Sequence, residues 1–397
     1  MNHKEQILLN MNQEELIELT SQLVSIPSHY KVPGGETRVA RVISERLRAE
    51  NISSEVEEVF DERCNVWASL PGTDPKAPSL LLCGHLDTVL AEGMDHEPFS
   101  GMVKDGKLWG RGAADMKGGN AAMLYAMMAI KRSGISLKGD LIYAGLVGEE
   151  SPNNSEGARY WVSHHKRTDY AIVGEATGLN VAGYHKGMSW LKVHIQGKAS
   201  HASKPTQGIN AVSVAARMIA ALEDELLPQL ALRKHDYVAP PTLSIGKISG
   251  GLQNNTVPHQ CWFSMDRRYI PGENIAQVKG EIEEILQSVV QRYPGASFYI
   301  EEEPETQGRE TLESGIDNAL AETLVGCIKD VTGRIVKPGG VDYWTDGAHL
   351  ARMNTKTVVF GPGNIAQAHA ATEFIDIQEL FASAKIYALL AMQLLGV

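Results

Sequence analysis

The feature that most constrains this fold is a repeated alternation of short apolar runs with longer amphipathic segments. Apolar runs of strand length lie at residues 79–83, 141–147, 170–173 and 357–360, and segments with helical periodicity separate or flank them. Buried apolar strands that alternate with helices are typical of a mostly parallel sheet covered by helices on both faces. The sequence therefore predicts an α/β fold built around such a sheet.

The pattern changes in the middle of the chain. Strand-like alternation appears between residues 181 and 303, near 189–197, 242–249, 259–269 and 296–302, together with two helical segments. Two helices with about four antiparallel strands suggest a separate α+β domain. We therefore predict a domain at 181–303 that is inserted between the two parts of the main domain, residues 1–180 and 304–397.

Charge and composition exclude several classes of partner. The 397 residues include 37 basic and 48 acidic ones, and a net charge of −11 has the wrong sign for binding nucleic acid or an anionic membrane surface. The longest strongly apolar helical run, 121–130, is about half as long as a membrane span. The first residues lack the pattern of a secretory leader, and the four cysteines show no paired spacing, so we expect buried, reduced thiols and a cytoplasmic protein.

Reactive side chains follow each of the predicted strands of the main domain, and one more lies in a glycine-rich loop at 110–119. In open α/β sheets, ligands bind beyond the carboxyl ends of the strands, so we expect these side chains to converge. They are two histidines and five carboxylates: His85, His369, Asp87, Asp115, Glu149, Glu150 and Glu175.

Such a set of side chains predicts a metal centre. Any one of them alone is more often an ordinary surface or hydrogen-bonded residue, but several carboxylates at one sheet edge repel one another unless a cation neutralises them. Imidazole and carboxylate ligands without thiolate suit zinc, with cobalt or manganese as substitutes. The ligands outnumber those of one catalytic zinc ion, so two ions that share a carboxylate fit better. We infer a two-metal hydrolase.

The motifs in this order resemble those of a known family. They are GHLDT at 84–88, GRGAADMKGG at 110–119, GEE at 148–150, GEAT at 174–177, and a late histidine after GPG at 361–363. Together they resemble the co-catalytic zinc family of acetylornithine deacetylases, succinyl-diaminopimelate desuccinylases, aminoacylases and glutamate carboxypeptidases. The resemblance covers nearly the whole chain and implies a zinc-peptidase-like catalytic domain. The stretch TDGAHLAR…VVFGPG is most similar to the deacetylase and desuccinylase branch.

The resemblance also implies roles for individual residues. Glu149 would be the general base, and Asp87 would hold the His85 ring by accepting its other proton, since the two residues are two apart on an extended segment and project to the same side. A cis peptide would follow Asp115. The implied metal ligands are His85 and Glu175 on one zinc ion, Glu150 and His369 on the other, and Asp115 bridging both.

The inserted domain has implied roles as well. In this family it serves as a lid and as the interface of a homodimer. His201, in GKASHASKP, resembles the lid histidine that polarises the scissile carbonyl, in its own subunit or in the partner. Asn255 and Arg268 resemble groups that hold the substrate's carboxylate, with Asn254 and Arg267 as adjacent alternatives.

The sequence therefore predicts a zinc-dependent amidohydrolase that releases the acyl group of a small N-acyl amino acid, with a metal-bridged water as nucleophile and Glu149 as base. A dipeptidase or carboxypeptidase that acts on a small peptide needs the same centre and remains an alternative. A non-catalytic metal-binding protein is disfavoured because Glu149 is present beside Glu150. A nucleotide-dependent enzyme is disfavoured because the glycine-rich loop at 110–119 matches no phosphate-binding motif.

Overall fold

The computed structural model describes residues 2–150 and 152–397, which fall into two units. Unit 1 contains the residues up to Tyr184, Glu313–Gly340 and Thr345–Val397, and unit 2 contains His185–Leu312 and Val341–Trp344. The insertion predicted at 181–303 thus differs from unit 2 at both limits. It also lacks the four-residue segment 341–344, which returns to unit 2 late in the chain.

The central sheet of unit 1 has the strand order β1-β2-β6-β3-β7-β17-β8-β15, with β16 beside β8. The four central strands, β6, β3, β7 and β17, are parallel to one another, whereas β1, β2 and β8 pair antiparallel. The predicted, mostly parallel sheet is therefore confirmed, with an unpredicted antiparallel hairpin, β1–β2, at one edge. The strands are β1 (Ser53–Phe60), β2 (Arg63–Leu70), β3 (Leu80–His85), β6 (Leu141–Leu146), β7 (Tyr170–Val173), β8 (Ala182–His185), β15 (Leu312–Glu313), β16 (Gly339–Val341) and β17 (Lys356–Val359).

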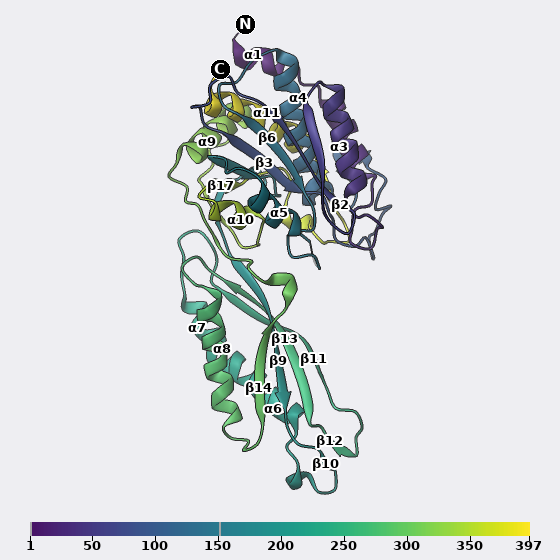
Figure 1. Ribbon diagram of the computed structural model, residues 1–397, viewed down its shortest axis with the longest axis vertical. Helices are drawn as coiled ribbons and strands as arrows, with labels where there is room; N and C mark the ends of the chain where they lie inside the picture. Colours follow the sequence, from purple (N-terminus) through teal and green to yellow (C-terminus); the bar gives the residue numbers. More distant parts are fainter. Residues whose placement is uncertain (1, 151) are drawn as a thin grey trace. The chain divides into compact units, whose positions relative to one another are not determined.

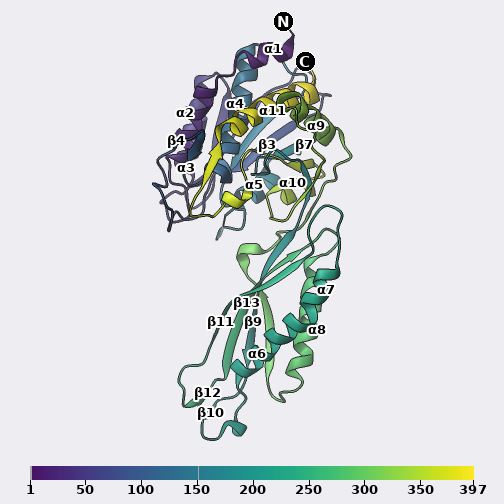
Figure 2. The ribbon, with the colours of Figure 1, turned by 180° about the vertical axis from the view of Figure 1, so that it is seen from behind.

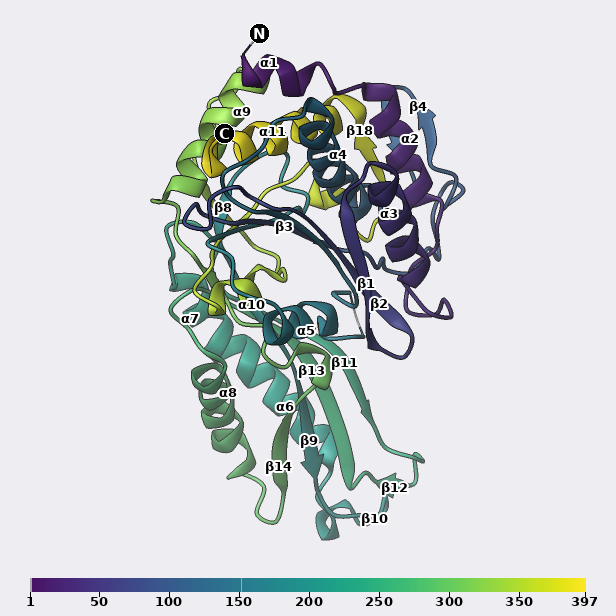
Figure 3. The same ribbon diagram turned by 45° about the horizontal axis from the view of Figure 1, so that its top comes forward.

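Helices cover both faces of this sheet, as Figures 1 and 3 show. The side chains of β3 alternate between the two faces of the sheet. Leu80 and Leu82 pack in the larger hydrophobic core, and Leu81 and Cys83 pack in the smaller one. The smaller core lies under α5 (Glu156–His164) and α10 (Gly347–Arg352). The larger core lies under α1 (His3–Leu8), α2 (Gln13–Val24), α3 (Thr37–Ala49), α4 (Gly118–Ser133), α9 (Ala319–Thr332) and α11 (Ile377–Leu395).

Helix α4 is the central helix of the larger core. Its residues 121–130 are all buried, as predicted from their composition. Gly119 allows the start of α4 to approach the loop after β7, because a Cβ at this position would lie 2.1 Å from the carbonyl oxygen of Gly174. Across residues 2–150 and 152–397, no helix combines the length and the apolar composition that a membrane span requires.

A small three-stranded sheet in unit 1 joins distant parts of the chain. Its order is β18-β5-β4, with β4 (Met102–Lys104), β5 (Lys107–Trp109) and β18 (Phe374–Asp376). The antiparallel pair β5–β18 places Trp109 opposite Phe374. The glycine-rich loop after β5 therefore lies against the segment before β18, which begins with the 3₁₀ turn η5 (Ile365–Gln367).

Unit 2 is an α+β unit with an antiparallel sheet of order β11-β13-β9-β14. Leu191, Val193 and Ile195 alternate along β9 and pack with the helices of the unit in one core, and Figure 2 shows these helices against the sheet. The predicted four antiparallel strands are confirmed. The elements are β9 (Gly187–Gln196), β10 (Ser200–His201), η2 (Pro205–Gln207), α6 (Ala211–Ala221), η3 (Leu222–Leu226), α7 (Leu227–Leu232), β11 (Thr242–Gly250), β12 (Thr256–Val257), β13 (Gln260–Tyr269), α8 (Ile275–Val290), β14 (Ser297–Glu302) and η4 (Pro304–Thr306).

Candidate metal centre

Strand register places three of the predicted segments at one edge of the unit 1 sheet. Strand β3 pairs in parallel with β6, with His85 opposite Leu146, and with β7, with Cys83 opposite Val173. The carboxyl ends of the three strands therefore lie next to one another. The residues that follow them, at 87, 149–150 and 175, reach the same region, as the α/β arrangement predicted.

The glycine-rich loop brings Asp115 to this edge. Gly112 has φ of 84°, a left-handed conformation that favours glycine, and a Cβ there would lie 2.7 Å from the Thr88 side chain. The segment η1 (Ala113–Lys117) follows and leads into α4, with Asp115 and Met116 in non-helical backbone conformations. The peptide bond between Asp115 and Met116 is cis, as the family resemblance implied.

The two carboxylate oxygens of Asp115 face two different histidines. Its Oδ1 lies 3.0 Å from His85 Nε2, and its Oδ2 lies 3.6 Å from His369 Nε2. Glu175 Oε1 lies 3.5 Å from the same His85 nitrogen, and Glu150 Oε1 lies 2.9 Å from the same His369 nitrogen. Asp115 thus stands between two pairs, each made of one histidine and one glutamate.

The donor set fits metal ions. Ligand atoms of His85, Asp115 and Glu150 all lie within 4.8 Å of one another. The carboxylates of Asp115, Glu149, Glu150 and Glu175 are all buried, so water screens their mutual repulsion poorly. Burial raises the pKa of Glu175 well above its usual value, and the charges of its acidic neighbours raise it further. Divalent cations would relieve this repulsion with the oxygen and imidazole ligands that zinc accepts.

The same acidic surroundings raise the pKa of both histidines. Burial lowers the pKa of His85, but the carboxylates of Glu175 and Asp115 outweigh this effect and hold it well above its usual value. The hydrogen bond with Glu150 raises the pKa of His369 to about 9. Metal binding would therefore release protons from these imidazoles.

Asp87 contacts the His85 ring, as predicted, and has other partners as well. Its carboxylate lies 3.5 Å from His85 Nδ1, and its backbone carbonyl oxygen is nearer to the same nitrogen, at 3.0 Å. That carboxylate accepts hydrogen bonds from the backbone N–H groups of Glu149 at 3.2 Å and Glu150 at 2.9 Å. Asp87 therefore connects the end of β3 to the loop that carries the candidate base.

The three candidate residues of the inserted domain all lie in unit 2. His201 is exposed on β10, and its Nδ1 lies 2.7 Å from the Ser203 hydroxyl. Asn255 is beside it, because β10 pairs with β12 and the Asn255 carbonyl accepts a hydrogen bond from Ala202 N–H. Arg268 lies at the other end of β13 and is paired with Asp266, with Nε and Oδ1 2.8 Å apart. The structure brings His201 and Asn255 together, but not Arg268.

Two buried ion pairs that were not predicted from the sequence adjoin the candidate centre. Glu373 is paired with Arg111 and accepts a hydrogen bond from the backbone N–H of Asp115. Glu36 is paired with Arg63, and its Oε1 accepts a hydrogen bond from the backbone N–H of Gly148 at 3.1 Å. Arg111 could have been singled out by its position inside the glycine-rich loop. Its partner could not, because Glu373 is 262 residues away in the sequence.

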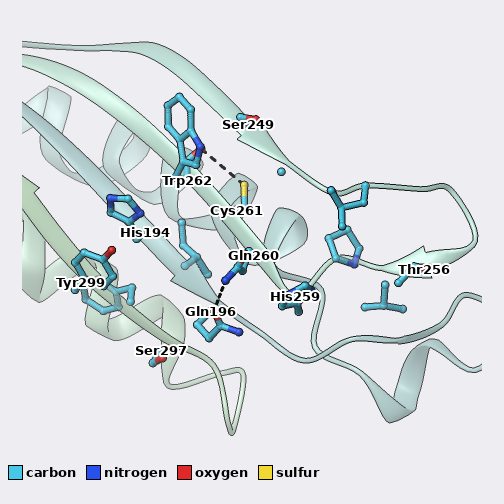
Figure 4. A pocket seen from close by; sticks show the side chains of 17 residues that line it. His194, Gln196, Ser249, Thr256, His259, Gln260, Cys261, Trp262, Ser297 and Tyr299 are labelled. Carbon is cyan, nitrogen blue, oxygen red and sulfur yellow. Dashed lines mark hydrogen bonds between the residues drawn. The ribbon is translucent and has the colours of Figure 1, made fainter.

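A pocket of about 430 Å³ lies in unit 2, at one end of its sheet (Figure 4). The rings of His194 and Tyr299 stack there with their centroids 4.5 Å apart, and Trp262 pairs with His194 across β13 and β9. Within the described ranges, no predicted metal ligand and none of the three candidates of unit 2 lines this pocket. The pocket is therefore distinct from the candidate metal centre.

Comparisons with known proteins confirm the resemblance. Residues 81–393 match the model of peptidase family M20/M25/M40. The chain is 31% identical to an acetylornithine deacetylase of Photorhabdus laumondii, over 95% of this chain and 97% of the relative, and 32% identical to one of Proteus mirabilis, over 93% and 94%.

Solved structures agree in fold. Aminopeptidase PepT from Bacillus cereus matches with a TM-score of 0.77 and 20% identity, over 97% of this chain and 99% of that one. The YXEP protein of Bacillus subtilis, described as a dinuclear metal-binding peptidase of family M20, matches with a TM-score of 0.70 and 17% identity, over 96% and 98%. From its match to the family model and its identity to these deacetylases over nearly its whole length, this chain belongs to peptidase family M20/M25/M40.

Proposed function

We propose that this protein is a two-metal amidohydrolase that releases the acyl group of an N-acyl amino acid. The observation that carries the proposal is the position of Asp115, whose two carboxylate oxygens face two different histidine–glutamate pairs. A carboxylate in this position is suited to bridge two metal ions. The N-acyl substrate follows from the relatives named acetylornithine deacetylase, which match almost the whole chain.

The proposed ligands are those of the two pairs and the carboxylate between them. Zinc is the proposed metal, with cobalt or manganese as substitutes, because the ligands are imidazoles and carboxylates without thiolate. When bound, the ions would supply Lewis acidity toward the scissile carbonyl and toward water. The sites are His85 and Glu175 for one ion, Glu150 and His369 for the other, and Asp115 for both.

Glu149 is the proposed general base. It is buried beside the ligand Glu150, and its backbone is held by Asp87. Its carboxylate would take a proton from the attacking water and later deliver it to the leaving amine, so that one group serves both halves of the reaction. The low exposure of this site favours such transfers because bulk water competes weakly for the proton.

Unit 2 is the proposed lid and dimerisation domain. We propose that His201 stabilises the oxyanion of the transition state, and that Asn255 and Arg268 hold the substrate's carboxylate. Strand β11 is an outer strand of the unit 2 sheet and carries an exposed Ile248, with an exposed Leu252 just beyond it. An outer strand with exposed apolar side chains supports a homodimer through this unit.

A cytoplasmic location is also proposed. Its support is that all four cysteines, Cys64, Cys83, Cys261 and Cys327, are buried free thiols. Free thiols persist in reducing compartments.

A panel of substrates tests the proposed activity. Zinc-loaded protein should cleave N-acetyl amino acids with a kcat/KM about tenfold or more above that for matched dipeptides, because a pocket shaped for a small acyl group discriminates against larger groups by about this factor. The measurement is amine release from acetyl, succinyl, formyl and aminoacyl derivatives of the same amino acids, with chelator-treated protein as the control. Cleavage of the aminoacyl derivatives alone would replace the proposal with the dipeptidase alternative.

A further inference from the structure

A buried ion pair, Arg111 with Glu373, contacts the loop that carries Asp115. The Glu373 side chain is fully buried. Its Oε1 accepts hydrogen bonds from the backbone N–H groups of Ala114 at 3.0 Å and Asp115 at 3.1 Å, and its Oε2 accepts one from Arg111 Nη1 at 2.6 Å. One carboxylate therefore holds the backbone of the proposed bridging ligand.

Arg111 extends these contacts to the loop that carries His369. Its Nη2 donates a hydrogen bond to the carbonyl oxygen of Ala370 at 3.2 Å, directly after His369 in the chain. His369 has φ of 58°, a left-handed conformation that a residue with a side chain keeps only where its surroundings hold it. The ion pair is thus bonded on one side to the Asp115 loop and on the other to the His369 loop.

The backbone reinforces this connection. The N–H of Gly110 donates a hydrogen bond to the Glu373 carbonyl oxygen at 3.1 Å, next to the antiparallel pair β5–β18. The two loops come from parts of the sequence about 260 residues apart, and this contact is one of the places where they meet. All of these contacts lie within unit 1.

A contribution to folding stability does not by itself explain why a charged pair, Arg111 and Glu373, is buried here. Removing two charges from water costs about as much as their attraction returns, and well-packed apolar side chains are often as stabilising as a buried ion pair. An apolar pair, however, would accept no hydrogen bond from Asp115 and donate none to Ala370. We propose that Glu373 and Arg111 are positioning residues that set the separation between the Asp115 carboxylate and the His369 imidazole, an inference that rests on the proposed two-metal function.

Two variants test the contribution of each member of the ion pair. In Glu373→Gln, one acceptor oxygen becomes an amide NH₂ group, so the side chain cannot satisfy all three donors. In Arg111→Lys, the charge remains, but a single ammonium group cannot reach Glu373 and Ala370 as the guanidinium does. Loss of a group that orients metal ligands typically weakens metal binding by about 10- to 100-fold. Glu373→Gln should show a loss of this size, and Arg111→Lys should weaken mainly the ion held by His369.

The measurement is zinc affinity by titration against a competing chelator, with the melting temperature of the metal-free protein recorded in parallel. The control is Glu50→Gln, which weakens a half-buried ion pair of unit 1 in which Arg132 Nε lies 2.9 Å from Glu50. Arg132 is in the last turn of α4, at the opposite end of that helix from Asp115. This control should lower the melting temperature and leave zinc affinity unchanged. Activity lost by the two variants at limiting zinc should return at excess zinc, which a merely unfolded protein would not show.

Three outcomes decide the inference. Weakened zinc binding in the Arg111 and Glu373 variants, but not in Glu50→Gln, supports it. Wild-type zinc affinity in folded Arg111→Lys and Glu373→Gln would overturn it and leave the proposed function intact; if Glu373→Gln does not fold, Arg111→Lys decides alone. Wild-type protein that binds fewer than two zinc ions would overturn the proposed function and, with it, this inference.

Discussion

Replacing Glu149 with Gln should lower kcat by about 10²- to 10⁴-fold, while the metal content stays near that of the wild type. Gln has nearly the same shape as Glu but cannot accept the proton of the attacking water or return it to the leaving amine. The loss should reach the upper end of that range, because one carboxylate is proposed for both transfers. KM should change little, since the side chain is not proposed to bind the substrate. Steady-state kinetics and elemental analysis of the same sample check both parts.

The neighbouring residue provides the control for this experiment. Glu150 lies one position along the chain and is equally buried, but it is paired with His369 and is a proposed ligand. Glu150→Gln should therefore weaken the binding of one metal ion, and excess metal should restore part of the activity. If Glu149→Gln lost metal and its loaded fraction kept full turnover, the roles assigned to the two glutamates would be reversed.

Asp115→Asn should have the largest effect on metal binding. The substitution replaces one of two oxygens that face different histidines, so both proposed sites lose a ligand or its charge. We expect both ions to bind more than 100-fold more weakly, beyond the roughly 10- to 100-fold cost of losing a group that only orients a ligand. Activity should fall in parallel. Zinc titration against a competing chelator measures the affinities.

Asp169→Asn is the matched control for Asp115. Asp169 lies at the opposite ends of the same strands, where its Oδ2 accepts a hydrogen bond from Ser79 N–H at 2.9 Å just before β3. Its loss should lower stability and leave zinc binding unchanged. If Asp115→Asn lost the affinity of only one ion and the other kept its wild-type affinity, Asp115 would be a ligand of a single site and not a bridge.

The clustering of the predicted side chains could be expected from the sequence because much of the information for it is local. His85, Glu150 and Glu175 lie at or just after strand ends, and parallel strands bring such positions to one edge of a sheet without any knowledge of packing. The structure places His85, Asp115 and Glu150 within one small cluster for this reason. The antiparallel sheet of unit 2 was predictable in the same way, from the period-two alternation that shows at Leu191, Val193 and Ile195.

Features that depend on tertiary contacts were not predictable. The hairpin β1–β2 was missed because its first strand carries Glu55, Glu57 and Glu58 at a partly exposed sheet edge, where strand formation depends on its partner. The contact of Asp87 with the His85 ring was predicted, but nothing in the local sequence shows that the Asp87 carboxylate also accepts hydrogen bonds from the N–H groups of Glu149 and Glu150. The pair Arg111–Glu373 and the segment 341–344 of unit 2 depend equally on contacts between distant parts of the chain.

The central claim is that two metal ions share Asp115, and its most direct test is the zinc stoichiometry of the wild-type protein. Metal-free protein should be titrated with zinc, and bound zinc per chain and hydrolysis of an N-acetyl amino acid should be measured at each step. Bound zinc should approach two equivalents per chain, and full activity should require both ions. Binding that never exceeds one equivalent, with full activity at that point, would contradict it.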